Sequence, residues 1–232
     1  MINFKNLTKS YNKNTVLDID LLEIPKGQAF GLVGNNGAGK TTLFSCLLDL
    51  IKPTKGLVTN NKINVRESED WKSFSSAYLD ESFLIGYLMP EEYFYFIGEL
   101  RNVKQKEVYE FLKQFEDLFN GEILGGKKYI RDLSKGNQKK VGIVAALIGS
   151  PSVIILDEPF ANLDPTTQIR LKKIIKKLSS DDGVTVLISS HDLQDVTEVS
   201  ERIVLLEKGK IIKDIKTSKK TLKELESYFT KE

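Results

Sequence analysis

Residues 28–42 read QAFGLVGNNGAGKTT, and this segment gives the strongest indication of the fold. Their first six residues are mostly apolar and predict a short strand, which leads directly into a glycine-rich loop. The stretch from Thr41 to Leu50 has helical length and ends before Pro53, because proline cannot continue a helix. The order of strand, loop and helix is the first half of an α/β unit.

The loop at residues 34–42 matches G-x-x-x-x-G-K-[ST], a pattern that binds the phosphates of nucleoside triphosphates. Glycines let backbone N–H groups surround phosphate oxygens, and the following helix directs its positive N-terminus at the anion. Lys40 is expected to reach the β- and γ-phosphates, and the Thr41 hydroxyl is expected to bind Mg²⁺. A glycine-rich turn with a chance lysine is the structural alternative, but the flanking strand and helix favour a phosphate loop. The predicted nucleotide-binding residues are Gly34, Asn35, Asn36, Gly37, Ala38, Gly39, Lys40, Thr41 and Thr42.

The identity of the base is indicated by two weaker features. The chain contains no Asn-Lys-x-Asp segment of the kind that recognises guanine in GTPases. Tyr11 follows the first predicted strand and could stack its ring on adenine, as aromatic side chains do on bases. An ordinary tyrosine at a strand edge is the alternative. Together these features favour ATP.

A second decisive stretch is VIILDEP at residues 153–159. Its first four residues are all apolar, which is typical of a strand buried on both faces of a parallel sheet. Asp157 and Glu158 then lie at the carboxyl end of that strand, where ligands bind in open α/β sheets. Asp157 is suited to hold Mg²⁺, and Glu158 to polarise the attacking water as general base. Two solvent-exposed acids at a strand end are the alternative.

Apolar periodicity places further elements along the chain. Residues 2–7 and 16–24 predict strands, residues 184–188 predict a second fully buried strand, and residues 165–178 predict a helix between the two buried strands. This alternation favours an α/β fold with a mainly parallel sheet.

The same pattern suggests one domain with a subdivided plan. Residues 1–81 and 151–216 are expected to form the nucleotide-binding α/β core. Residues 82–150 carry aromatic and aliphatic residues at helical spacing and predict an inserted helical subdomain. Residues 217–232 predict a short C-terminal helix.

Composition sets limits on the class of protein. The 232 residues carry a formal net charge of +2, which does not favour nucleic acid or a charged membrane surface as the main partner. Cys46 is the single cysteine, so the sequence excludes an intrachain disulfide. No run approaches the roughly 18–20 apolar residues of a membrane-spanning helix, and no signal peptide is recognisable at the N-terminus. The sequence thus predicts a cytoplasmic protein whose membrane-spanning function, if any, lies in another chain.

Leu-Ser-Lys-Gly-Asn-Gln at residues 133–138 then adds a family resemblance. This segment resembles the signature of ABC ATPases, usually written LSGGQ. Together with residues 28–42 and 153–159, it gives the chain its resemblance to the ABC ATPase family. Lysine replaces the first glycine here, and an extra asparagine precedes the glutamine. The resemblance implies that Ser134, Lys135, Gly136, Asn137 and Gln138 contact ATP bound to a partner cassette. Ser134 is also a good helix N-cap, which is the structural alternative.

Other family positions follow in the expected order. Ala-Asn-Leu-Asp at residues 161–164 resembles the family's D-loop, which links the two sites of the dimer, with Asp164 at its end. His191, the single histidine, matches the switch histidine that contacts the γ-phosphate. The glutamine expected after the strand near residues 76–79 is missing, and Glu81 is assigned to its place in preference to Asp80. This Glu81 could still bind Mg²⁺ or its water.

The resemblance covers nearly the whole chain and has consequences for fold and function. It implies a P-loop NTPase core with a mainly parallel sheet, an N-terminal antiparallel β subdomain and an inserted α-helical subdomain. It also implies an ATP-binding and ATP-hydrolysing subunit with catalytic Glu158, His191 and Lys40, and with Mg²⁺ held by Thr41, Glu81 and Asp157. A membrane-spanning permease and a second ATPase subunit, identical or paralogous, are the implied partners, at the cytoplasmic face of the membrane.

Several alternatives stay open at this point. The signature variant and Glu81 resemble the branch with drug, bacteriocin and sodium exporters, which favours export over import. A non-transport ABC ATPase, acting in DNA repair, on chromosomes or with ribosomes, is the other function considered. Such proteins usually carry a long coiled coil or two cassettes, and the sequence shows neither. The transported substrate and the role of the C-terminal tail are not encoded in any recognised motif.

Overall fold

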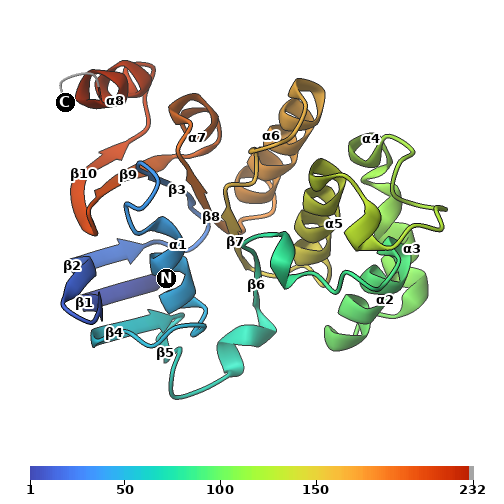
Figure 1. The fold of residues 1–232 in the computed structure, drawn as a ribbon, viewed down its shortest axis with the longest axis horizontal. Helices are drawn as coiled ribbons and strands as arrows, with labels where there is room; N and C mark the ends of the chain where they lie inside the picture. The colour runs from blue at the N-terminus through green and yellow to red at the C-terminus, as the bar shows by residue number, and fades with distance from the viewer. Residues whose placement is uncertain (230–232) are drawn as a thin grey trace.

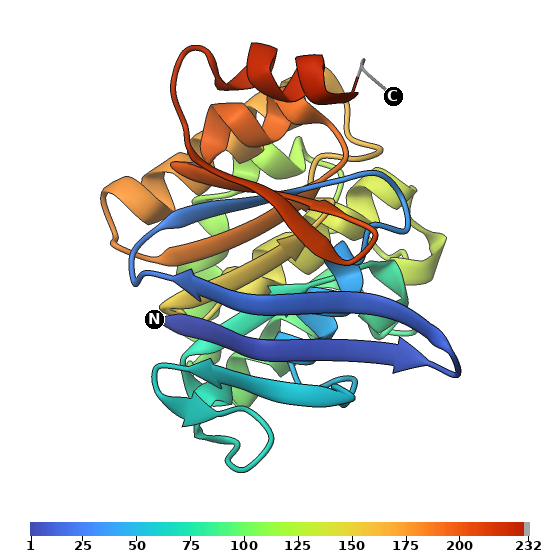
Figure 2. The same ribbon diagram turned by 90° about the vertical axis from the view of Figure 1, so that its left-hand side faces the viewer.

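The computed structural model describes residues 1–229, which form two sheets and a group of helices (Figure 1). The smaller sheet is antiparallel and has the order β2-β1-β4-β5. Its strands are β1 (Ile2–Tyr11), β2 (Asn14–Ile24), β4 (Lys55–Asn60) and β5 (Ile63–Asn64). Figure 2 shows the long β1 and β2 strands lying side by side across one face of the molecule.

The larger sheet is mostly parallel and has the order β10-β9-β3-β8-β7-β6. Its parallel strands are β3 (Ala29–Val33), β6 (Ser75–Tyr78), β7 (Val153–Asp157), β8 (Thr185–Ser190) and β9 (Arg202–Glu207). The edge strand β10 (Lys210–Lys216) is antiparallel to β9. The expected α/β class with a mainly parallel sheet and an N-terminal antiparallel sheet is confirmed.

Strand β7 shows why its residues are all apolar. Val153 and Ile155 pack into the core between the two sheets, together with residues of the helix α1 (Lys40–Leu47). Ile154 and Leu156 point to the opposite face and pack into a second core. Because successive side chains of a strand alternate between faces, a strand covered on both sides has no solvated position.

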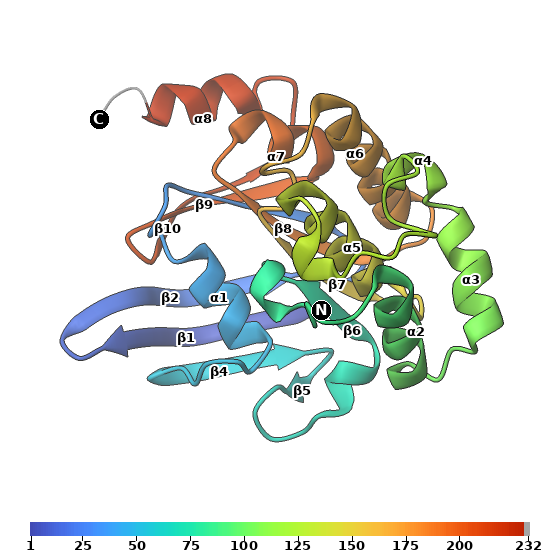
Figure 3. The ribbon, with the colours of Figure 1, turned by 45° about the vertical axis from the view of Figure 1, so that its right-hand side comes forward.

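The second core joins the sheet to the helical part of the chain, which lies to one side of the sheet in Figure 3. The helices between β6 and β7 are α2 (Pro90–Leu100), α3 (Gln105–Lys113), α4 (Glu116–Phe119) and α5 (Lys135–Leu147). Phe94 and Phe119 are fully buried there and stack with ring centroids 5.8 Å apart. Short 3-10 turns cover Asp70–Ser73, Glu81–Phe83 and Ile130–Asp132. The predicted inserted helical subdomain is therefore present.

The C-terminal third supplies the remaining helices. These are α6 (Pro165–Ser180), α7 (Leu193–Val199) and α8 (Thr221–Phe229). The predicted tail helix thus appears as α8, while residues 230–232 of that prediction lie outside the described residues. None of the helices within residues 1–229 is long and apolar enough to cross a membrane.

Helix α1 ends three residues before the predicted Leu50. Asp49 adopts a left-handed conformation with φ of 52°, and the Leu50 N–H donates to the Ser45 carbonyl at 2.9 Å. This is the geometry of a helix C-terminal cap. Aspartate is one of the few residues other than glycine that enter the left-handed region readily.

Candidate active site

The phosphate loop lies where β3 ends and α1 begins, at one edge of the larger sheet. Its glycines are required by close backbone neighbours. A Cβ on Gly34 would lie 2.2 Å from the Leu206 carbonyl oxygen, and one on Gly39 would lie 2.9 Å from the Val16 carbonyl oxygen. Gly39 also has φ of 108° at the N-cap position of α1, a conformation that favours glycine. The loop is thus packed between β2 and β9.

Lys40 is the buried cation of this loop, with 6% of its surface exposed. Its ammonium donates to the Gly34 carbonyl at 2.7 Å and lies 3.3 Å from Glu158 Oε1. The phosphate loop and the acidic end of β7 are therefore in direct contact, so a phosphate bound at the loop would lie beside both a cation and a carboxylate.

Asp157 is held by hydroxyl groups from two different elements. Thr41 Oγ1 donates to Asp157 Oδ2 at 2.5 Å, and the Ser189 hydroxyl of β8 donates to Asp157 Oδ1. Burial raises the pKa of Asp157; the two hydroxyl bonds and Lys40 oppose this rise, and Glu158 adds to it. The parallel β7–β8 register, which pairs Asp157 with Ser189, produces the contact.

Glu158 leaves the strand with φ of 47°, in the left-handed region. Its N–H donates to the carbonyl and the hydroxyl oxygen of Ser189, at 3.2 and 3.1 Å. These bonds turn the side chain toward the loop after β8, where Glu158 Oε2 lies 2.8 Å from His191 Nδ1. Lys40, Glu158 and His191 therefore form a chain of contacts, and His191 remains 53% exposed toward the open side of the site.

The oxygen donors at this edge suit Mg²⁺, which binds through one or two carboxylates and is completed by water and substrate phosphates. Thr41 and Asp157 lie in contact and present a hydroxyl and a carboxylate. Within residues 1–229, no three His, Cys, Asp or Glu side chains group in a way that could hold a metal ion by themselves. Glu81, the third predicted ligand, accepts a hydrogen bond from the Tyr78 hydroxyl at 2.8 Å.

The remaining nucleotide-binding predictions lie around the loop. Tyr11 ends β1 with 49% of its surface exposed, and the Lys9 ammonium lies 4.5 Å from the centre of its ring. An exposed ring at the end of the β1–β2 hairpin is available for stacking on a base. Asn35 and Ala38 close the loop through a backbone hydrogen bond of 3.0 Å.

The signature segment begins α5 and is organised by Ser134. The Ser134 hydroxyl accepts from the Asn137 N–H at 3.2 Å, which is an N-cap bond. Gln138 is buried and donates to the Arg131 and Leu133 carbonyls at 3.2 and 3.0 Å. The predicted extra Asn137 is an ordinary residue of an uninterrupted helix. Its neighbour Lys135 is exposed at the start of the same helix.

The signature and the D-loop meet within one chain. A Cβ on Gly136 would lie 3.1 Å from the Asn162 carbonyl oxygen, so the glycine keeps this approach close. Asp164 caps α6, accepting from Thr167 N at 3.0 Å and Thr167 Oγ1 at 2.5 Å. These bonds lower the pKa of Asp164. Asp164 thus has a structural role in its own chain.

Three residues that contact the site belong to none of the recognised sequence motifs. Ser189 bonds both Asp157 and Glu158, Tyr78 holds Glu81, and Lys139 donates to the Glu158 carbonyl at 2.8 Å. The polar end of the apolar strand at residues 184–188 could have indicated Ser189. No comparable signal marks Lys139, which occupies a helix between other polar residues.

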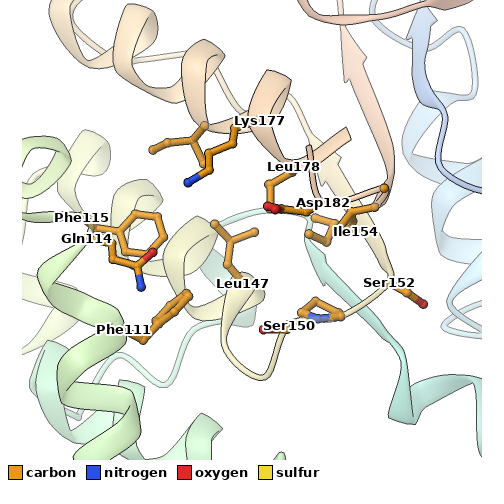
Figure 4. A pocket seen from close by; sticks show the side chains of 14 residues that line it. Phe111, Gln114, Phe115, Leu147, Ser150, Ser152, Ile154, Lys177, Leu178 and Asp182 are labelled. Carbon is orange, nitrogen blue, oxygen red and sulfur yellow. The ribbon is translucent and has the colours of Figure 1, made fainter. Parts of the chain in front are cut away.

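A cavity of about 750 Å³ lies elsewhere, between α3, the loop after α5 and the end of α6. Figure 4 shows Phe111, Phe115 and Leu147 lining it, with Lys177 and Asp182 nearby. None of the predicted site residues lines this cavity. The predicted catalytic residues lie at the edge of the larger sheet.

Comparisons with known proteins show the family to which the chain belongs. The family model described as "ABC transporter" matches residues 17–161. The chain is 32% identical over 225 residues to the bacitracin transport ATP-binding protein BcrA of Enterococcus faecalis, covering 94% of this chain and 70% of BcrA. It is 31% identical over 230 residues to the methionine import ATP-binding protein MetN of Francisella tularensis, covering 94% and 64% respectively.

A solved structure is similar over almost its full length. The ATP-binding cassette MJ0796, in a dimeric post-hydrolysis state bound to ADP and Pi, superposes with a TM-score of 0.80 at 28% identity. The match covers 94% of this chain and 99% of MJ0796. The present chain therefore belongs to the ABC transporter family. It is an ATP-binding subunit of that family with the fold and chemistry of an ATPase.

Proposed function

We propose that this chain powers export by binding and hydrolysing Mg-ATP as half of a dimer coupled to a separate membrane-spanning permease. The observation that carries the proposal is the convergence of Lys40, Thr41, Asp157, Glu158 and His191 at one sheet edge. These groups provide a cation that binds the phosphates, ligands for the metal, a general base and a polar partner for that base. The arrangement suits hydrolysis of a γ-phosphoryl group.

In the proposed cycle, Lys40 and the loop N–H groups bind the phosphates, and Thr41 and Asp157 hold Mg²⁺. Glu158 accepts the proton of the attacking water, while His191 orients the Glu158 carboxylate and contacts the γ-phosphate. Bound Mg²⁺ would neutralise part of the phosphate charge. Residues 134–138 of each subunit contact the ATP of the other, so loss of the γ-phosphate releases the interface.

Docking of the permease is proposed at a groove of about 330 Å³ between the larger sheet and the helical part of the chain. The groove includes the loop after β6 with Asp80 and Phe83, and it is bordered by Leu50 and Leu100. Phe83, Leu50 and Leu100 are 57%, 50% and 64% exposed, and exposed apolar groups of this kind mark interaction sites. Phe94 of α2 is fully buried and belongs to the core, so it is not available for this contact.

The direction of transport rests on the similarity to exporters. Lys135 in the signature and Glu81 after β6 resemble that branch, and BcrA is named for bacitracin transport. MetN, which is named for import, is similar at a comparable level, so we rest the proposal of export on those two residues. A location at the cytoplasmic face of the membrane follows from the proposed permease contact.

The sandwich dimer is tested by the mass of the Glu158→Gln variant on size-exclusion chromatography with light scattering, with and without Mg-ATP. Slowed hydrolysis should trap the closed state, so we expect a monomer without nucleotide and a dimer with Mg-ATP. The Lys40→Ala, Glu158→Gln double variant is the control and should stay monomeric. A mass that does not change with Mg-ATP would contradict self-pairing of the isolated subunit and indicate either a different partner subunit or closure only on the permease.

A further inference from the structure

Lys139 is a buried lysine on the signature helix α5 that the proposed reaction leaves without a role. Only 5% of its surface is exposed. Burying an ammonium group is unfavourable unless polar partners compensate it. Its position beside the acidic end of β7 supplies them.

The partners of Lys139 come from two different segments. Its Nζ donates to the main-chain carbonyl of Glu158 at 2.8 Å and lies 4.0 Å from Glu81 Oε1. That Glu81 oxygen also accepts from the Tyr78 hydroxyl. One side chain thus connects the signature helix, the residue proposed as general base and the loop after β6.

The bond to Glu158 acts on a strained peptide. Glu158 has φ of 47°, and a residue with a Cβ stays in the left-handed region only when its surroundings hold it there. Its N–H donates to Ser189. Its carbonyl accepts from Lys139 Nζ at 2.8 Å and, in a longer bond of 3.4 Å, from the Ala161 N–H. These bonds hold the main chain of Glu158, while Lys40 and His191 contact its carboxylate directly.

We propose that Lys139 is a positioning residue that aligns Glu158 for hydrolysis and transmits movements of the Glu81 loop and of α5 to it. This inference rests on the proposed role of Glu158 as general base. A shift of α5 or of the Glu81 loop changes the hold of Lys139 on the Glu158 carbonyl. Hydrolysis is then faster when Lys139 keeps its hydrogen bond to the Glu158 carbonyl.

The test compares Lys139→Met with Lys140→Met, measuring ATP turnover, ATP affinity and thermal unfolding. Lys140 is equally buried on the same helix, but its ammonium pairs with Glu122 at 3.7 Å. Methionine keeps most of the volume without the donor. We expect Lys139→Met to lower kcat roughly 10- to 100-fold, as displaced reacting groups do, with ATP affinity within about threefold. The control should keep turnover within about threefold of the unmodified protein.

A double-mutant cycle with Glu81→Gln tests the coupling. If Lys139 acts between Glu81 and Glu158, the combined loss of kcat is smaller than the product of the two single losses. Lys139→Gln, which keeps an N–H donor and removes the charge, serves if the methionine variant folds poorly. It should lower kcat less than methionine does, with unchanged ATP affinity.

Two results would overturn the proposal: normal turnover of Lys139→Met, or equal losses in Lys139→Met and Lys140→Met. Glu158→Gln is measured in parallel, because it distinguishes the role of Glu158 as general base from the role of Lys139 in positioning it. If that variant still turns over ATP, the assignment of the base fails. If it is inactive while Lys139→Met is normal, only the role of Lys139 fails.

Discussion

At the scale of single residues, the site depends on contacts between groups far apart in the sequence. Thr41 and Asp157 are 116 positions apart and share a hydrogen bond of 2.5 Å. Glu158 and His191 are 33 positions apart, with 2.8 Å between carboxylate and imidazole. Because both acids follow a buried strand, the sheet fixes where they point. The chemistry is thus determined by strand ends that meet at one edge.

Lys40→Ala should weaken ATP binding while leaving the fold intact. A hydrogen bond to a charged group contributes about 1.5–3 kcal/mol, so we expect affinity to fall roughly 10- to 100-fold by calorimetry. Lys26→Ala, at an exposed lysine of a turn, is the matched control and should bind normally. Retained affinity in Lys40→Ala would refute the assignment of the phosphate loop.

At the scale of elements, α6 and α7 are joined by a cluster of charges. Lys172 Nζ of α6 lies 2.8 Å from Asp195 Oδ1 and 2.9 Å from Glu198 Oε2 of α7. The hydrogen bond from Lys172 lowers the pKa of Glu198, against the opposing effect of burial. A lowered carboxyl pKa stabilises the fold above the ordinary value of 4.5 and loses this effect as pH falls through the folded value.

Glu198→Gln should therefore reduce stability at neutral pH and less so in acid. Because 40% of the Glu198 side chain is exposed, the ion pair contributes little, and we expect a loss below about 1 kcal/mol. Urea unfolding at pH 7 and at successive values below 4.5 measures it, with Glu99→Gln on the exposed end of α2 as control. A difference from the unmodified protein that does not shrink with falling pH would contradict the ion-pair account.

Strands and helices with a strong pattern of apolar residues could be predicted from the sequence. Strands that form mainly through hydrogen bonding to a neighbouring strand could not. The strands at residues 153–156 and 184–188 were recognised because every position is apolar. The strand β10 alternates exposed and half-buried residues, and the prediction omitted it together with β4, β5 and β9. Lys139 was missed for a related reason: a lysine in a helix is expected to be exposed, and its burial depends on a partner 19 positions away.

At the scale of the whole molecule, the larger sheet and the helical part carry different groups of the predicted site residues. The larger sheet brings Lys40, Asp157, Glu158 and His191 together at one edge. The signature segment lies in the helical part, at the N-terminus of α5. The two parts meet along the groove that includes Asp80 and Phe83. A permease bound in that groove would contact both parts at once. Tyr78 lines the groove and contacts both Glu81 and Lys139.

The most direct test of the account is the rate of ATP hydrolysis by Glu158→Gln, with ATP affinity measured on the same sample. Glutamine keeps the shape of the side chain but removes the base, so hydrolysis should fall roughly 10²–10⁴-fold with affinity within about threefold. Glu99→Gln should hydrolyse ATP normally. Near-normal turnover by Glu158→Gln would contradict the central claim that this carboxylate, held between Lys40 and His191, activates the attacking water.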